Sequence, residues 1–471
     1  MTDLCYISAT DALRGFAAGE LSPVELVEAV IARAEVVEPT INAFADTFFD
    51  EALTKAKEAE ARYAAGDARP LEGLPVAVKE EAAIEGQRWT QGSLALRDEV
   101  ADHTAVFVQR IIDAGGIVHA RTTTPEFSCA PVTWTKLWGV TRNPWNPEFS
   151  PGGSSGGSGA SLAAGSTTLA TGSDIGGSIR IPSSFSGVVG FKPPYGRVPE
   201  VEIFNLDHYC HEGPMARTVA DCALLENVIA GPHPSDIVSL RPKLEVPTTY
   251  DSIAGMRIAV SADLGCYNVD PDVAAATEQA VERLRDAGAT VEPVDLPWRL
   301  EDISRAVNAH FGMIFGPSIA EIYVADSDDF CSYVHELARA SEPIGKADFV
   351  AGLALEGMLY RPLGEILERF DALVCPTFAV PALPAAWQTH EPVSDRIATP
   401  PDWLDVMMTL PFNIASRCPV MSVPSGRSRD GVPTGLSIVG KTYDDSTVFR
   451  IAAAHEARMP RWYTPDLRPA L

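Results

Sequence analysis

The stretch PGGSSGGSGASLAAG, from Pro151 to Gly165, decides how the rest of the chain is interpreted. Glycine and serine at this density are typical either of a flexible linker or of a tight backbone turn that aims a hydroxyl group. The run continues without a break into a dense segment of small and apolar residues that ends with GFKP at Pro193. A linker would separate two self-sufficient regions, whereas small residues let backbones pack closely. We therefore interpret the stretch as a turn within a core.

Two Gly-Gly-Ser turns lie in this region, one at Ser154 and the other at Ser178. Serine is a weak nucleophile until a base activates it. The nine histidines are scattered, and none is near either turn in the sequence. A lysine can also serve as the base. Lys79 ends a buried strand in LEGLPVAVKEEAAIEG, where restricted solvation would favour its neutral form, although an exposed lysine at a strand end is the alternative.

Five ordered motifs resemble the amidase signature family, and together they extend over nearly the whole chain. They are PVAVKE, PGGSSGGSGASLAAG, GSDIGGSIRIPSSFSGVVGFKP, GPMARTVAD and TLPFNIASRCPVMSVPSG. The resemblance implies a single α/β domain, 1–471, with a central mixed β-sheet sandwiched between α-helices. Within it we expect a helical N-terminal part (1–70), a catalytic core (71–220) and a remainder with pocket loops (221–471).

The resemblance also implies amide hydrolysis without a cofactor, by a Ser–Ser–Lys triad. Ser178 matches the nucleophile, Lys79 matches the base, and Ser154 matches the bridging serine, which follows a cis peptide bond after Gly153. The family's oxyanion hole falls on the backbone amides of Ile175, Gly176, Gly177 and Ser178. Asp174 and Arg180 would pair and brace this turn, unless they are ordinary surface charges.

Other features bear on the substrate rather than on the chemistry. Many family members have Lys-Asp-Asn where this chain has Lys79-Glu80-Glu81, and the segment 123–127, TTPEF, also departs from the common pattern. We expect the Pro-rich loop 377–403 to lie beside the pocket. The candidate pocket residues are Phe127, Ser128, Cys129 and Trp134, with core packing as the alternative for the tryptophans Trp134, Trp138 and Trp145.

The segment HYCH, from His208 to His211, could suggest zinc. A zinc site needs three or four ligands, and no second cluster accompanies these histidines in the sequence. We therefore predict no metal and interpret HYCH as a loop or part of the pocket mouth.

Composition limits the partners of the chain. The 471 residues carry a formal net charge of −26 and are 46% hydrophobic. This acidity argues against nucleic acid and anionic membranes as partners. The N-terminal sequence has no secretory pattern, and no apolar run is long enough to span a membrane. The eight cysteines are dispersed, which favours reduced thiols in a cytoplasmic protein.

Local patterns indicate alternating strands and helices, the arrangement of a layered α/β fold. SPVELVEAVIARAEVV predicts a helix with Ser22 as N-cap and Glu25 in a capping box. The segments 104–120 and 273–294 each predict a helix followed by a strand, and 256–263 and 371–377 predict strands. The apolar segment 349–360, FVAGLALEGMLY, is interpreted as a core helix.

The leading functional hypothesis is an amidase for a small apolar or aryl amide. With the same chemistry, a carbamate, anilide, hydrazide or ester is an alternative substrate. A second hypothesis is the glutaminase component of a tRNA-dependent amidotransferase, and a third is an inactive binding protein, against which the intact Lys79, Ser154 and Ser178 argue. The expected partner is a small molecule, and a homodimer is left open.

Overall fold

The computed structural model describes residues 3–200, 203–325, 327–393 and 403–471. Within these residues, eleven strands form one mixed sheet in the order β1-β3-β2-β6-β8-β7-β12-β13-β11-β9-β10. The strands are β1 (Phe44–Thr47), β2 (Pro75–Lys79), β3 (Ile117–Thr122), β6 (Leu169–Ser173), β7 (Val189–Lys192), β8 (Glu212–Ala216), β9 (Arg257–Val260), β10 (Thr290–Pro293), β11 (Ala372–Pro376), β12 (Val420–Arg427) and β13 (Pro433–Gly440). A separate ribbon pairs β4 (Trp134–Thr135) with β5 (Gly139–Val140).

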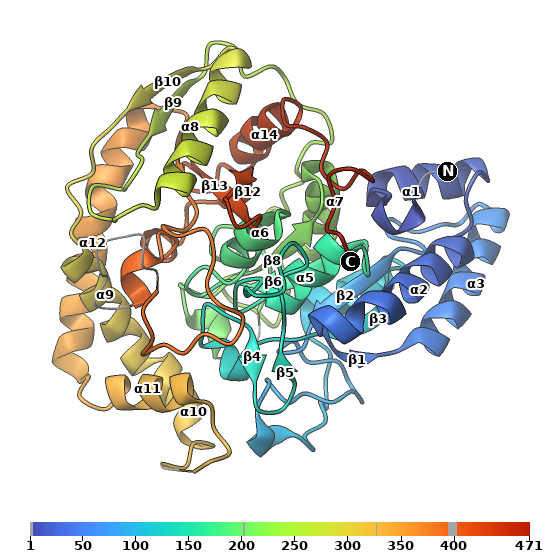
Figure 1. The fold of residues 1–471 in the computed structure, drawn as a ribbon, viewed down its shortest axis with the longest axis horizontal. Helices are drawn as coiled ribbons and strands as arrows, with labels where there is room; N and C mark the ends of the chain where they lie inside the picture. The colour runs from blue at the N-terminus through green and yellow to red at the C-terminus, as the bar shows by residue number, and fades with distance from the viewer. Residues whose placement is uncertain (1–2, 201–202, 326, 394–402) are drawn as a thin grey trace.

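Helices cover both faces of the sheet, as Figure 1 shows. They are α1 (Ala9–Ala18), α2 (Pro23–Ile41), α3 (Phe49–Ala65), α4 (Val106–Asp113), α5 (Gly156–Ala164), α6 (Arg180–Ser186), α7 (Val219–Ile229), α8 (Pro271–Asp286), α9 (Leu300–Met313), α10 (Phe315–Ala320), α11 (Ser332–Ser341), α12 (Lys346–Arg369), α13 (Pro411–Ile414) and α14 (Asp445–Glu456). The blue helices α2 and α3 lie at the β1 end, and the gold and orange helices α9 and α12 lie at the opposite end (Figure 1).

Alternating side chains of the buried strands separate two core layers. Val76 and Val78 of β2 pack into a core that includes residues of α4, α7, α8 and α14, whereas Ala77 between them packs with α5. In β11, Leu373 joins the core layer of α9 and α12, and Val374 joins the opposite one. Successive strand residues point to opposite faces, so a strand buried on both sides reads as a continuous apolar run. The expected α/β sandwich is confirmed.

The helices and strands predicted from capping residues and apolar patterns are confirmed in the segments below. Ser22 caps α2 by accepting a hydrogen bond from Val24 N, and Glu25 accepts one from Ser22 N, which completes the capping box. The segment 104–120 forms α4 and most of β3, and 273–294 lies in α8 and β10. The predicted strands at 256–263 and 371–377 are β9 and β11.

The interpretation of 349–360 as a core helix was wrong in part. The segment is helical, within α12, but Val350 is 65% exposed and Leu353 is 43% exposed. Gly352 and Leu359 are buried, and α12 packs against α9, α13 and β11. Apolar composition alone did not reveal that one face has no neighbour among the described residues.

Two further expectations concern the chain as a whole. All eight cysteines lie in the described segments, and each is a free thiol there. Among the described helices, none is both long and apolar enough to span a membrane.

Candidate active site

The topology brings Lys79 and the serines together at one edge of the sheet. Lys79 is the last residue of β2, and Ser173 is the last residue of β6. These strands are parallel neighbours, so their carboxyl ends meet at the same edge. Ser178 follows in the loop between β6 and α6, and Ser154 precedes α5, which packs against β2 and β6. Crevices at the carboxyl ends of strands are common ligand sites in open α/β sheets.

Lys79 contacts Ser154 directly. Its Nζ lies 2.7 Å from Ser154 Oγ and 2.8 Å from Ser173 Oγ, and Lys79 is 1% exposed. The Gly153–Ser154 peptide bond is cis, as predicted. Within the described chain, no hydrogen bond joins Ser154 Oγ to Ser178 Oγ, so only the first link of the predicted relay is formed. Catalytic hydrogen bonds often tighten only when substrate binds.

The loop that carries Ser178 presents free backbone donors. None of the four N–H groups of residues 175–178 donates to an acceptor in the described part of the chain. Ile175, Gly176 and Ser178 line a cavity. Gly177 has a φ of +132°, and a Cβ atom there would lie 2.3 Å from Thr409 Oγ1, so a side chain at this position would disrupt the loop. Free amides in a rigid loop are what an oxyanion requires.

A buried ion pair braces this loop from behind. Arg180 Nε and Nη2 donate to the two oxygens of Asp174 at 2.9 and 2.7 Å, and both side chains are 0% exposed. Asn413 Nδ2 donates to Asp174 Oδ1, and its Oδ1 accepts from Arg180. Burial alone would raise the pKa of Asp174, but the Arg180 guanidinium holds it well below its usual range. The expected pairing is present, and surface charge is excluded for both residues.

The unusual Glu80-Glu81 pair takes two separate roles. Glu81 Oε1 lies 2.9 Å from Lys79 Nζ, and Glu81 Oε2 accepts a hydrogen bond from Ser128 Oγ. Glu80 accepts hydrogen bonds from Thr90 Oγ1 and Gly92 N, and burial raises its pKa to about 7. Glu80 therefore holds a loop, whereas Glu81 links the lysine to the pocket wall.

The sequence analysis did not predict that Glu81 and Ser173 contact Lys79. Ser173 lies immediately before the loop of the second Gly-Gly-Ser turn, and its position at a strand end beside the strand of Lys79 was the available signal. Glu81 departs from the family pattern directly after Lys79, and that departure was the corresponding signal.

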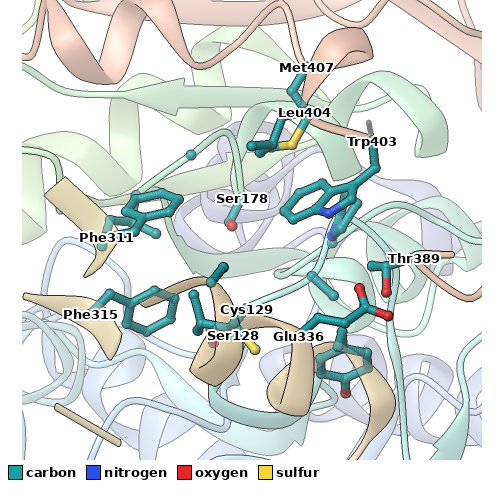
Figure 2. Close-up of a pocket in the computed structure, with 18 of the residues that line it drawn as sticks. Ser128, Cys129, Ser178, Phe311, Phe315, Glu336, Thr389, Trp403, Leu404 and Met407 are labelled. Atoms are coloured by element: carbon teal, nitrogen blue, oxygen red, sulfur yellow. The ribbon is translucent and has the colours of Figure 1, made fainter. Parts of the chain in front are cut away.

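A cavity of about 340 Å³ opens beside the Ser178 hydroxyl (Figure 2). Its walls are mostly apolar, with a few polar side chains, and come from segments far apart in the sequence. Ser128 and Cys129 line the cavity, as expected. Trp403, the last residue of the Pro-rich loop 377–403, also lines it, so this end of the loop lies beside the pocket as predicted. Residues 394–402 of the loop lie outside the described chain. The other principal side chains are Phe311, Phe315, Tyr333, Glu336, Leu337, Thr389, Leu404 and Met407.

The other candidate pocket residues do not line this cavity. Phe127 is 3% exposed and stacks on Phe330, and Trp134 packs edge-on against Tyr333. Trp134 therefore packs behind Tyr333, which lines the cavity, and Phe127 packs behind Phe330, which does not. Two other tryptophans pack elsewhere, Trp138 beneath Arg88 and Trp145 against Trp462. Residue type alone could not separate the wall of the pocket from the layer behind it.

The two histidines of HYCH point to different surroundings. His211 contacts the backbone oxygens of Asp174 and Ser416, and burial together with Lys192 lowers its pKa to about 3. His208 joins a network instead: its Nε2 lies 3.0 Å from Glu356 Oε2. Nearby, His310 Nε2 lies 2.6 Å from Asp207 Oδ1.

Asp207, His208 and His310 each offer one potential metal-ligand atom, and these atoms lie within 4.8 Å of one another. The structure thus brings together three potential ligands that the sequence did not show to be close. Hydrogen bonds already engage all three residues, to one another or to Glu356. Through these bonds, the network connects α9 and α12 to the loop before β8.

Comparison with known proteins assigns the chain to a family. The sequence model described as amidase matches residues 25–449. The chain is a member of the amidase signature family. One relative, a component of the glutamyl-tRNA(Gln) amidotransferase of Roseiflexus sp. (strain RS-1), is 33% identical over 99% of both chains. An acylamidase from Rhodococcus erythropolis is 33% identical over 99% of this chain and 98% of the relative.

Among solved structures, a bacterial aryl acylamidase of the amidase signature family superposes with a TM-score of 0.90. It is 29% identical and covers 96% of each chain. This amidase signature enzyme is therefore a hydrolase of amide C–N bonds, while its relatives differ in what they act on.

Proposed function

We propose that the chain hydrolyses small amides with an aryl or alkyl portion, through an acyl-enzyme on Ser178. The observation that carries this proposal is the cavity beside Ser178, whose walls include Phe311, Phe315 and Met407. Apolar and aromatic walls favour ligands that bury apolar surface, and a few polar groups fix their orientation. We further propose that 1–471 is one domain, because eleven of the described strands, from β1 near the start of the chain to β13 near its end, join a single sheet, with only β4 and β5 outside it.

In the proposed mechanism, neutral Lys79 takes a proton from Ser154, which takes one from Ser178 as Ser178 Oγ attacks the carbonyl carbon. The N–H groups of residues 175–178 donate to the resulting oxyanion. The tetrahedral intermediate collapses when the C–N bond breaks, and the relay returns a proton to the leaving nitrogen. Water then attacks the ester carbonyl by the same relay, releases the acid and restores Ser178.

Carbamates, anilides, hydrazides and esters share this chemistry and remain alternative substrates. The glutaminase alternative is suggested by the amidotransferase relatives. The cavity offers it less support, because the described lining residues include no lysine or arginine to pair with the α-carboxylate of free glutamine. The aryl acylamidase likeness supports the leading proposal.

The test is a substrate panel on the purified chain alone, containing acetanilide, a carbamate, an ester and glutamine. We expect hydrolysis of the anilide and none of glutamine. Ser178→Ala should abolish this turnover without changing the thermal unfolding midpoint, because it removes one hydroxyl. A fluorophosphonate should label Ser178 in the wild type, as read by mass spectrometry of the digest. Labelling of Ser154 instead would reverse the assigned roles, and turnover of glutamine alone would refute the substrate class.

A further inference from the structure

One carboxylate in the cavity beside Ser178 has no partner among the described residues. Glu336, on α11, is partly buried and lines the cavity with Ser178. In the described chain its carboxylate makes no hydrogen bond and no ion pair. Glu81, close by, differs because Lys79 and Ser128 already engage its oxygens. A partly buried carboxylate loses hydration, and this loss is offset only when a donor or a cation contacts it.

The same cavity contains a second polar atom that lacks a partner in the described part of the chain. Thr389 Oγ1 is buried, and it has no hydrogen-bond partner in the described chain. In Figure 2 the Glu336 carboxylate points toward the side of the cavity where Thr389 and Trp403 lie. Two hydrogen-bond acceptors and an indole ring together match a protonated amine, since ammonium groups donate hydrogen bonds and are attracted to aromatic faces.

The opposite side of the cavity has a different character. Phe311 and Phe315 lie across the Ser178 hydroxyl from Glu336 in the view of Figure 2. They approach each other edge-on, with ring centroids 5.9 Å apart. The cavity is thus apolar on one side of the nucleophile and acidic on the other.

We propose that the preferred substrate is an amide that carries a protonated amino group, bound by Glu336, on the side of the scissile bond opposite its apolar portion. The proposal rests on the proposed function and names the substrate class of that site. Glu336 acts as a specificity-determining residue, with Thr389 Oγ1 as a second acceptor. The formal net charge of −26 also favours the approach of a cationic substrate over that of an anionic one.

The test uses two pairs of anilides that differ only in an ammonium group. In one pair the group is on the amine part, with a phenyl ring on the acyl part: N-[4-(aminomethyl)phenyl]benzamide against N-(4-ethylphenyl)benzamide. In the other pair it is on the acyl part: 4-(aminomethyl)-N-phenylbenzamide against 4-ethyl-N-phenylbenzamide. We expect wild-type kcat/KM to be about 10-fold or more higher for the ammonium member of at least one pair, the factor typical of one charge-assisted hydrogen bond.

Glu336→Gln should lower kcat/KM for the ammonium member by about 10-fold more than for its neutral counterpart, which removes most of the preference. Glu342→Gln is the matched control, because this exposed carboxylate follows the same helix and does not line the cavity. It should behave as the wild type. Equal kcat/KM within both pairs, or equal losses for both members in Glu336→Gln, would overturn the proposal.

A binding measurement separates this inference from the proposed function. With Ser178→Ala protein, calorimetry should give a dissociation constant for the ammonium member about 10-fold or more below that of its ethyl counterpart. Adding Glu336→Gln should abolish the difference. If no anilide is hydrolysed but this difference is found, the proposed reaction fails and the ammonium site stands. Equal binding of both members in both pairs overturns the ammonium site, whatever the turnover.

Discussion

Removing Arg180 should destabilise the protein strongly, because it leaves Asp174 buried without its cation. Arg180 makes two hydrogen bonds to the carboxylate, at 2.9 and 2.7 Å, and both side chains are fully buried. It also donates to Thr409 O and Asn413 Oδ1. Breaking a buried pair from one side typically costs about 3–5 kcal/mol. We expect Arg180→Met to lower the free energy of unfolding by about that amount, measured by urea denaturation with circular dichroism.

The double variant Asp174→Asn/Arg180→Met supplies the control. It removes both charges, so it should recover about 1–2 kcal/mol of the loss, since the largest cost is the uncompensated carboxylate. The Arg180→Met variant should also lose most turnover, because the pair braces the loop of Ser178. An Arg180→Met protein within about 1 kcal/mol of the wild type, or a double variant less stable than the single one, would refute the reasoning.

The pH dependence follows from the direction of the pKa shift. The pKa of Asp174 is lower in the folded state than in the unfolded state, because the Arg180 guanidinium and Asn413 outweigh the effect of burial. The pair therefore contributes its full stability above the unfolded value, near pH 4, and loses it as the pH falls through the folded value. The stability gap between wild type and Arg180→Met should narrow below about pH 4 in the same denaturation experiment.

Two further substitutions test the proposed relay and the loop. Lys79→Ala should reduce kcat by about 10²-fold or more, and Lys79→Arg should not restore it, because arginine stays protonated and cannot accept the proton of Ser154; restored turnover would show that charge or packing is what matters. Gly177→Ala should abolish turnover, because its Cβ would lie 2.3 Å from Thr409 Oγ1 at a φ of +132°. Acylation of that variant at the wild-type rate, followed by stopped-flow, would show that the loop tolerates a side chain.

Short-range sequence signals were sufficient for the scaffold and for the proposed triad. Ser22 and Glu25 are three residues apart, so the capping box of α2 could be read directly. The glycines around Ser154 and Ser178 mark turns that few other residues allow, and Lys79 ends an apolar run. Family resemblance then assigned roles to these residues. The ion pair between Asp174 and Arg180 could also be predicted from the sequence, because the two residues lie at either end of one short loop.

Only the tertiary structure decided what surrounds the nucleophile. Phe311, Glu336 and Trp403 are separated from Ser178 by more than a hundred residues, and they meet it only because α9, α11 and the chain after residue 402 pack over the same edge of the sheet. Phe127 and Trp134 show the converse, since they are close to Ser128 in sequence and yet lie behind the cavity wall. Hydrophobic packing is non-directional, so residue type predicts burial but not which buried or half-buried side chain faces the substrate.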